Sequence, residues 1–134
     1  MNKSAGPAPA DLNKNRKRST ELHELGIVFE VVKTVKNFAG NNGLTKIDTV
    51  VLQIGELSSI VPHYIEECYP AAVDGTDMQD TKLKIEMIPG NARCNDCFNI
   101  YNIIMNNGKC PECGSQNLDI LSGREFMIKE IIAC

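Results

Sequence analysis

CNDCFNIYNIIMNNGKCPECG, residues 94–114, contains two Cys-x2-Cys pairs that are separated by twelve residues. Each pair turns the chain so that its two thiolates point to one centre. Twelve residues are enough for a hairpin that brings the pairs together, and Gly108 and Gly114 permit tight turns. The spacing therefore predicts one tetrahedral metal site with four sulfur ligands: Cys94, Cys97, Cys110 and Cys113.

Zinc is the metal that this pattern favours, because Zn²⁺ takes four thiolates tetrahedrally. A site closed by four ligands has no open position, so we expect a structural role. Iron in a rubredoxin-like site is the main chemical rival. Two separate redox pairs would each need a thioredoxin-like strand and helix, which neither has. The segment has few apolar residues of its own, and structural zinc supplies about 10–16 kcal/mol in small modules, so we expect it to unfold without metal.

The composition narrows the classes of partner and the compartment. The 134 residues are 43% hydrophobic and 5% aromatic and carry a net charge of −3, which gives no bulk attraction to nucleic acid or to an anionic membrane. No run of about 18 apolar residues exists to span a membrane, and the N-terminal residues lack the apolar region of a signal peptide. We therefore expect a cytoplasmic protein, whose cysteines bind metal rather than form disulfides.

Residues 1–20 are polar and contain proline and glycine, which predicts a disordered tail. A helix is expected from Thr20, which can cap it, to the Gly and Asn residues at 40–43. Its apolar residues recur at helical spacing: Leu25, Val28, Val31 or Val32, Val35 and Phe38. A second helix is expected at 62–73, with Pro62 in its first turn and a kink or early end at Pro70.

Alternating apolar residues predict strands at 46–54, 82–88 and 125–132. The inward side chains are expected to be Val50, Leu52 and Ile54 in the first strand and Leu83, Ile85 and Met87 in the second. The order predicts an α+β fold: a small three-stranded sheet with two helices on one face, plus an inserted zinc-ribbon-like lobe. The expected domains are a tail (1–20), an α+β domain (21–90 with 121–134) and a zinc-binding lobe (91–120).

Five segments together resemble the HypA/HybF hydrogenase maturation proteins across about residues 22–132. These segments are Leu22-His23-Glu24-Leu25, Ile54-Gly55-Glu56-Leu57-Ser58, Pro89-Gly90-Asn91-Ala92-Arg93-Cys94, Cys110-Pro111-Glu112-Cys113-Gly114-Ser115 and Ile120-Leu121-Ser122-Gly123-Arg124-Glu125. The resemblance implies a nickel metallochaperone, not an enzyme, that helps insert Ni²⁺ into [NiFe] hydrogenase and, in some organisms, urease. It also implies a HypB-type GTPase and the hydrogenase large subunit precursor as partners. A homodimer through the helical face is a further option.

In the family, nickel binds at the N-terminus, where a starting Met precedes His and Glu. The matching His here is His23, with the backbone nitrogens of Leu22 and Glu24 as further candidates. The family site uses the terminal amine, whereas Leu22 stands in place of the starting Met and residues 1–21 precede it. One hypothesis is translation from an alternative leucine start codon, which would place Met at position 22. An intact mass that includes residues 1–21 would reject it.

Other polar residues have ordinary alternatives. Glu24 suits either nickel or the helix dipole, and His63 is expected to be an exposed residue beside Pro62. Cys68 is expected to pack in its helix, and Cys134 to be a free thiol. Glu56 resembles a family position with a structural role.

No catalytic set and no GxxxxGK[ST] loop is present in the sequence. The alternative function from another class is a zinc-ribbon adaptor for nucleic acid or transcription, which the acidic balance opposes.

Overall fold

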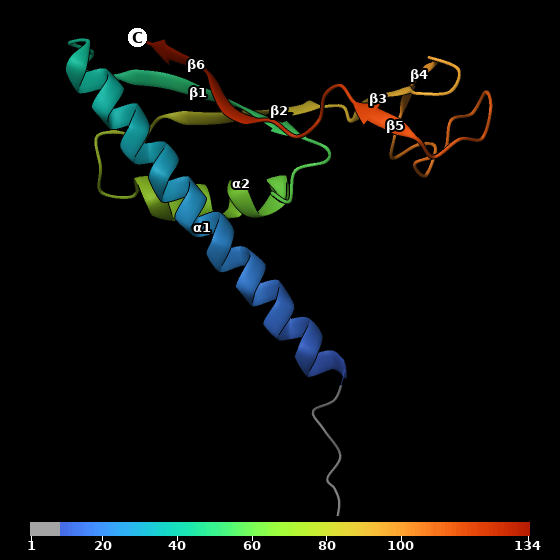
Figure 1. The fold of residues 1–134 in the computed structure, drawn as a ribbon. Helices are drawn as coiled ribbons and strands as arrows, with labels where there is room; N and C mark the ends of the chain where they lie inside the picture. The colour runs from blue at the N-terminus through green and yellow to red at the C-terminus, as the bar shows by residue number, and fades with distance from the viewer. Residues whose placement is uncertain (1–8) are drawn as a thin grey trace, which may run out of the picture. The chain divides into compact units, whose positions relative to one another are not determined.

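The computed structural model describes residues 9–134, and their side chains from His23 onward. Its elements, coloured along the chain in Figure 1, are α1 (Pro9–Asn41), β1 (Ile47–Gly55), α2 (Pro62–Val73), β2 (Lys82–Ile88), β3 (Asn91–Cys94), β4 (Ile100–Asn102), β5 (Leu118–Ile120) and β6 (Phe126–Ala133). Two helices and two small sheets make an α+β fold, which confirms the predicted class.

The chain forms two compact units. One contains the helices and comprises the described residues up to Thr45 together with Val61–Gln79; the other contains both sheets, in Lys46–Ile60 and Asp80–Cys134. This grouping differs from the expected domains, which joined the first sheet to the helices and set 91–120 apart. The physical reason is a hydrogen-bonded junction between the two sheets, described below.

Helix α1 begins at Pro9, well before the expected start at Thr20. Proline is favoured in the first turn of a helix, and the Lys, Arg, Ala and Leu residues that follow are good helix formers. Their polarity suggested disorder, but residues with high helix propensity can form a helix without an apolar stripe. Residues 1–8 of the predicted tail lie outside the described residues.

The apolar stripe of α1 is buried at Val28, Val31, Val32 and Val35. Phe38 was expected to continue it but is 45% exposed, because the helix ends one turn later at Asn41. Gly43 has a φ of 66°, which lets the N–H of Leu44 donate to the carbonyl of Ala39 at 2.9 Å. This glycine-based C-terminal motif confirms the predicted end of the helix.

Helix α2 has the predicted bounds, with Pro62 in its first turn. It continues through Pro70 to Val73, so the proline does not shorten it. The N–H of Asp74 donates to the carbonyl of Pro70 at 3.0 Å and closes the last turn. The buried side chains of α2 are Ile65, Tyr69, Ala72 and Val73, and α2 contacts α1 (Figure 1).

The predicted three-stranded sheet is present, with the order β2-β1-β6. β1 pairs parallel with β2 and antiparallel with β6, and the segment that contains α2 makes the crossover that a parallel pair requires. Val50, Leu52 and Ile54 are buried as expected, and Val51 is buried as well. β1 is thus the central strand, covered on both of its faces.

Met87 was expected to face inward with Leu83 and Ile85 but is 47% exposed, while these two are half-buried. β2 is an edge strand, so side chains near its end have a neighbouring strand on one side only. The strict alternation of the sequence identified the strand correctly but not the exposure of Met87.

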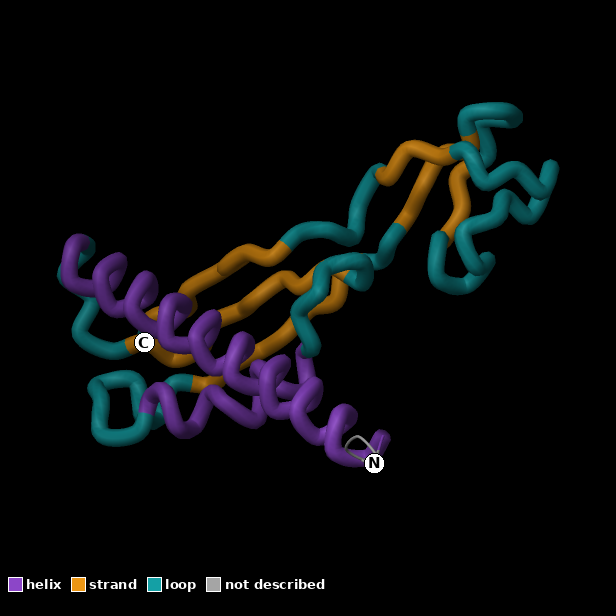
Figure 2. The backbone as a smooth tube through the Cα atoms, turned by 60° about the horizontal axis from the view of Figure 1, so that its bottom comes forward, coloured by secondary structure: helices purple, strands orange, loops and turns teal. Residues whose placement is uncertain are grey.

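A second three-stranded sheet, with the order β4-β3-β5, forms the cysteine lobe (Figure 2). Its strands are antiparallel and short. The buried residues Ala92, Cys94, Tyr101 and Cys110 form its small core, and the half-buried Ile103 and Leu118 pack against them. Strands of three or four residues show no reliable alternation, so the sequence predicted only a hairpin there.

Two chain segments connect the two sheets, β2 to β3 and β5 to β6, and the segment after β1 is hydrogen-bonded to them. The N–H of Gly55 donates to the carbonyl of Glu125, and the N–H of Leu57 donates to the carbonyl of Gly123, both at 2.7 Å. A Cβ on Gly55 would lie 2.0 Å from the carbonyl oxygen of Gly123, and one on Gly90 would lie 2.6 Å from the side chain of Leu57. The junction therefore has room only for glycine at these positions.

Gly55→Ala is expected to destabilise the protein by about 3 kcal/mol or more, because the new methyl group must displace backbone. Gly26→Ala is the matched control, since nothing lies within 4 Å of its Cβ position in helix α1. It should stabilise by about 0.5–1 kcal/mol through helix propensity. Urea denaturation measures the free energy of unfolding of both variants. Equal values for Gly55→Ala and Gly26→Ala would contradict a tightly packed junction.

Candidate metal centre and nickel-motif residues

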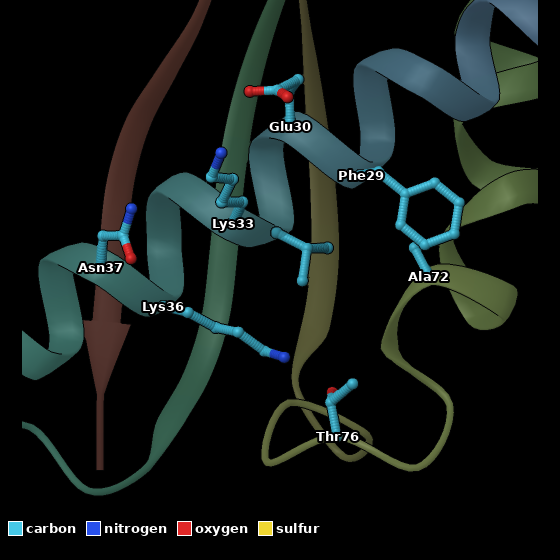
Figure 3. A pocket seen from close by; sticks show the side chains of 8 residues that line it. Phe29, Glu30, Lys33, Lys36, Asn37, Ala72 and Thr76 are labelled. Carbon is cyan, nitrogen blue, oxygen red and sulfur yellow. The ribbon is translucent and has the colours of Figure 1, made fainter.

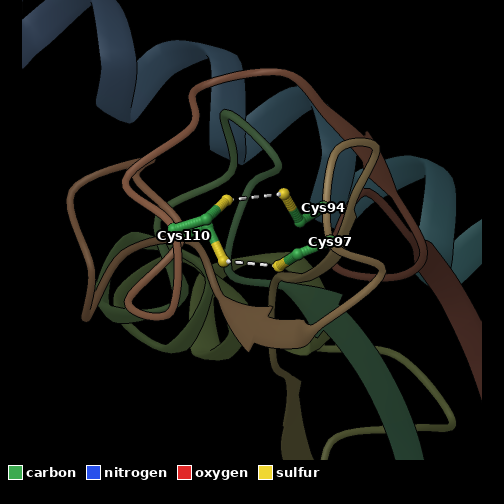
Figure 4. Close-up of side chains that lie close together, drawn as sticks. Cys94, Cys97 and Cys110 are labelled. Atoms are coloured by element: carbon green, nitrogen blue, oxygen red, sulfur yellow. Dashed lines mark hydrogen bonds between the residues drawn. The ribbon is translucent and has the colours of Figure 1, made fainter.

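The four cysteines of the predicted site converge in the structure. Their sulfur atoms all lie within 4.8 Å of one another, with Cys94 Sγ 3.5 Å from Cys113 Sγ and Cys97 Sγ 3.5 Å from Cys110 Sγ. Figure 4 shows Cys94 and Cys97 of the first loop facing Cys110 of the second. Four sulfurs around one tetrahedral ion at about 2.3 Å lie about 3.8 Å apart, so the cluster has the size of a metal site.

The two Cys-x2-Cys loops have the same backbone geometry. In the first, the N–H of Phe98 donates to the carbonyl of Cys94 at 2.9 Å; in the second, Gly114 donates to Cys110 at 2.8 Å. Phe98 and Gly114 occupy the same place and both have positive φ, 66° and 77°. A non-glycine residue is uncommon in this conformation. Both loops therefore adopt the one turn that points two sulfurs the same way.

Hydrogen bonds and burial divide the thiols into two kinds, one with a lowered pKa and one with a raised pKa. Burial raises the pKa of Cys110, but backbone N–H groups, that of Cys113 foremost, overcome it and lower the pKa to about 6. The N–H of Cys97 is the main cause that lowers the pKa of Cys94. The N–H of Asn99 would lower the pKa of Cys97, but burial and the neighbouring thiols raise it to about 12. Four thiolates at this distance repel one another, and a divalent cation removes that conflict.

Burial is also uneven, since Cys94 and Cys110 are buried while Cys97 and Cys113 are exposed. The buried pair belongs to the small core of the lobe. A core of this size contributes little folding free energy, so the lobe depends on what holds its sulfurs together. The donor set and the geometry fit a bound metal ion.

Glu56 connects the cysteine lobe to the first sheet. Its Oε1 accepts hydrogen bonds from the N–H of Gly90 at 2.8 Å and from Nδ2 of Asn102 at 3.1 Å. These bonds, with that from Gly90 first, lower the pKa of Glu56. Glu125 has a comparable position, since its Oε1 accepts from the N–H of Gly123 at 2.5 Å. The junction thus unites three of the segments that carry the family resemblance: residues 54–58, 89–94 and 120–125.

The residues of the predicted nickel motif lie in α1. His23 is exposed, and its backbone lies within the helix, where amide groups are already hydrogen-bonded. Glu24 is fully buried, and its Oε2 accepts a hydrogen bond from the N–H of Val61 at 2.9 Å. The side chain of Leu22 lies outside the described side chains. Sequence reasoning missed the burial of Glu24, although it lies four residues before Val28 on the apolar stripe.

The remaining candidates have ordinary surroundings. His63 is exposed, as expected, with Nε2 2.9 Å from Oε1 of Glu67. Cys68 is half-buried in α2 and Cys134 is exposed, so neither belongs to the cluster.

A groove of about 450 Å³ lies between α1 and α2, lined by Phe29, Lys33, Lys36, Ala72 and Thr76 among others (Figure 3). The sequence did not predict it.

The fold and the cysteine cluster define a small α+β metal-binding protein. A family model described as "Hydrogenase/urease nickel incorporation, metallochaperone, hypA" matches residues 22–133. The chain belongs to this HypA family, which confirms the resemblance seen in the sequence motifs. None of its described helices is long and apolar enough to cross a membrane.

Individual relatives agree with the family match. The hydrogenase maturation factor HypA of Chlorobium luteolum is 35% identical over 111 residues, covering 83% of this chain and 95% of that protein. The protein of the same name from Trichodesmium erythraeum is 41% identical over 110 residues, covering 82% and 94%. The solution structure of the Ni metallochaperone HypA from Helicobacter pylori, 23% identical, aligns with a TM-score of 0.57 over 82% of this chain and 96% of that one. That likeness shows a shared fold.

Removal of the metal is expected to unfold the lobe of β3, β4 and β5, because its own core is small. Amide NMR signals of residues 91–120 should then lose their dispersion, while those of α1 and α2 keep theirs. Cys110→Ser should do the same without a chelator. Cys134→Ser is the control, because it lies outside the cluster and should leave the metal content unchanged. An unchanged lobe after chelation would contradict this dependence.

Acid should weaken the junction. The folded pKa of Glu56 is lowered, so its contribution to stability is present above the unfolded value of about 4.3 and is lost as the pH falls through the folded value. Glu56→Gln should therefore lose less stability than the wild type between about pH 6 and about pH 3.5. Urea titrations at both values measure this. Glu66→Gln, at an exposed position in α2, is the control and should keep the wild-type difference.

Proposed function

We propose that this protein is a nickel metallochaperone that binds Ni²⁺ near His23 and delivers it to an apo-enzyme, the precursor of the hydrogenase large subunit. The single observation that carries the proposal is the family match, which begins at residue 22 and so includes His23 near its start. The imidazole of His23 is exposed, as a ligand that must take up and release an ion needs to be. The chain's role is binding and transfer, not catalysis.

His23 is the anchor of the proposed site. Imidazole suits Ni²⁺, and nickel accepts square-planar sets of nitrogen ligands. The backbone nitrogens of Leu22 and Glu24 could complete such a set only where they are released from helical hydrogen bonds. Nickel binding in the full chain therefore requires the helix to open locally around residue 22. A site that has to open the backbone can also release its ion on contact with a partner.

The four-cysteine cluster holds zinc in this proposal. Zn²⁺ has no preferred geometry from d-electrons and accepts the tetrahedral arrangement, and four thiolates leave no position for a substrate. The metal is therefore structural: Cys94, Cys97, Cys110 and Cys113 hold the lobe together. An iron-loaded protein would be coloured, so absorption spectra and elemental analysis of the purified protein distinguish the two metals.

The proposed partners follow from what the chain lacks and from its relatives. It has no GxxxxGK[ST] sequence, so nucleotide hydrolysis would come from a HypB-type GTPase. Its relatives are named hydrogenase maturation factors, which supports a hydrogenase client, and the family description includes urease as a second one. We place this activity in the cytoplasm and include a homodimer among the working forms.

A zinc-ribbon adaptor for nucleic acid has weaker support. Between Cys94 and Cys113, one basic residue, Lys109, stands against Asp96 and Glu112. Nucleic-acid binding rests on basic side chains at phosphates and is sensitive to salt. Salt-sensitive binding to DNA or RNA would favour the adaptor function, and its absence at low salt would exclude it.

His23→Ala is expected to abolish nickel binding, because it removes the only imidazole of the motif, and to leave the fold and the zinc content unchanged. Calorimetric titration with Ni²⁺ measures the affinity, and elemental analysis measures the zinc. His63→Ala is the matched control, because it removes the other, exposed histidine and should bind nickel as the wild type does. Normal binding by His23→Ala would show that the site lies elsewhere.

A further inference from the structure

Glu24 is a carboxylate inside the helical unit. Among the residues whose side chains are described, 23–134, the buried polar or charged ones are Glu24 and Thr81, and Glu24 is 0% exposed. Its Oε2 accepts the hydrogen bond from Val61, while its Oε1 has no partner among the described residues. A buried carboxylate with one oxygen unpartnered is costly, so its gain in stability is a poor reason for its presence. A role in holding α1 and α2 in one particular arrangement explains the presence of this carboxylate better.

The partner of Glu24 is the N-terminus of α2. The N-cap residue of that helix is Val61, which makes no side-chain cap, and the next residue, Pro62, has no N–H. In a capping box, a Glu at the third helical position bonds back to the N–H of the N-cap residue, but α2 has Tyr64 there. Glu24 supplies the missing carboxylate from the other helix, and its charge suits the positive end of the α2 dipole.

Glu24 also lies at the point where the described side chains of α1 change from exposed to buried. It is the first buried residue among the described side chains of the helix, and it continues the buried stripe of Val28, Val31 and Val35. His23, the residue before it, is exposed. Successive residues point about 100° apart around a helix, so while the helix is closed a fixed Glu24 sets the direction of His23. The helix from Glu24 onward is held against α2, whereas His23 is not buried.

We propose that Glu24 is a positioning residue for nickel: its buried hydrogen bond to Val61 holds α1 at the turn where the nickel motif begins, and its carboxylate does not bind the ion. This inference rests on the proposed nickel site at His23. The backbone before Glu24 can then open to admit Ni²⁺, while the helix after it stays in place. As a ligand, the carboxylate would have to leave the interior and uncap α2.

The test compares nickel affinity, the absorption spectrum of bound nickel and the melting temperature in the full-length protein. Glu24→Ala removes the hydrogen bond and should weaken nickel binding about tenfold. Glu24→Gln keeps an oxygen that can accept from Val61 and should stay within about threefold of the wild type. Val61→Pro removes the donor from the other side and should match Glu24→Ala, whereas Val61→Ala retains the N–H and should bind as the wild type does.

Val28→Ala is the matched control for stability. It destabilises the same buried stripe without touching the hydrogen bond, so it should lower the melting temperature and leave the nickel affinity unchanged. All variants that bind nickel should share one absorption spectrum, because none changes a ligand. This separates positioning from a merely structural role.

Two results would overturn the proposal. Wild-type nickel affinity in Glu24→Ala would mean that the residue only stabilises the fold. A changed nickel spectrum in Glu24→Gln, at an unchanged melting temperature, would make the carboxylate a ligand. If the wild type itself ignores Ni²⁺, the proposed function fails instead. Equal melting temperatures of Glu24→Ala and Val61→Pro would then still show that both variants lose the same hydrogen bond between the two helices.

Discussion

The convergence of four cysteine sulfurs within 4.8 Å is the constraint on which the cysteine lobe depends. The lobe has three short strands and a core of a few side chains, too small to order some thirty residues without help. Its two loops repeat one turn, with positive φ at Phe98 and Gly114, to point the sulfurs at a common centre. A bound cation would relieve the repulsion among neighbouring thiolates, so we expect metal binding and the folding of the lobe to be coupled.

The lobe is tied to the first sheet by hydrogen bonds of the backbone and of carboxylates. Glu56 bonds to Gly90 and Asn102, and glycine at 55, 90 and 123 lets the three crossing segments approach closely. Most of the sequence segments typical of the family meet at this junction or at the cysteines. In this structure these segments either join the cysteine lobe to the first sheet or supply its cysteines.

The helical unit follows a different principle. Its core is made mainly of aliphatic side chains, and among its described residues one buried carboxylate, that of Glu24, links the two helices at one point. The exposed His23 lies next to that point. A site for a transferred ion has to be both located and adaptable. In the proposed site, a fixed Glu24 followed by buried valines provides the location, and the backbone around the exposed His23 provides the adaptability.

The sequence by itself determined which four cysteines converge, the bounds of α2 and β2, the presence of β1 and the family. These depend on local spacing, on alternation and on proline and glycine chemistry, which act over a few residues. It misjudged the start of α1 and the exposure of Phe38 and Met87, because helix length and edge position are settled by neighbours. Only the tertiary structure decided the roles of Glu24 and Glu56. Their partners, Val61 and Gly90, lie more than thirty residues away in the chain, and no local pattern specifies such a hydrogen bond.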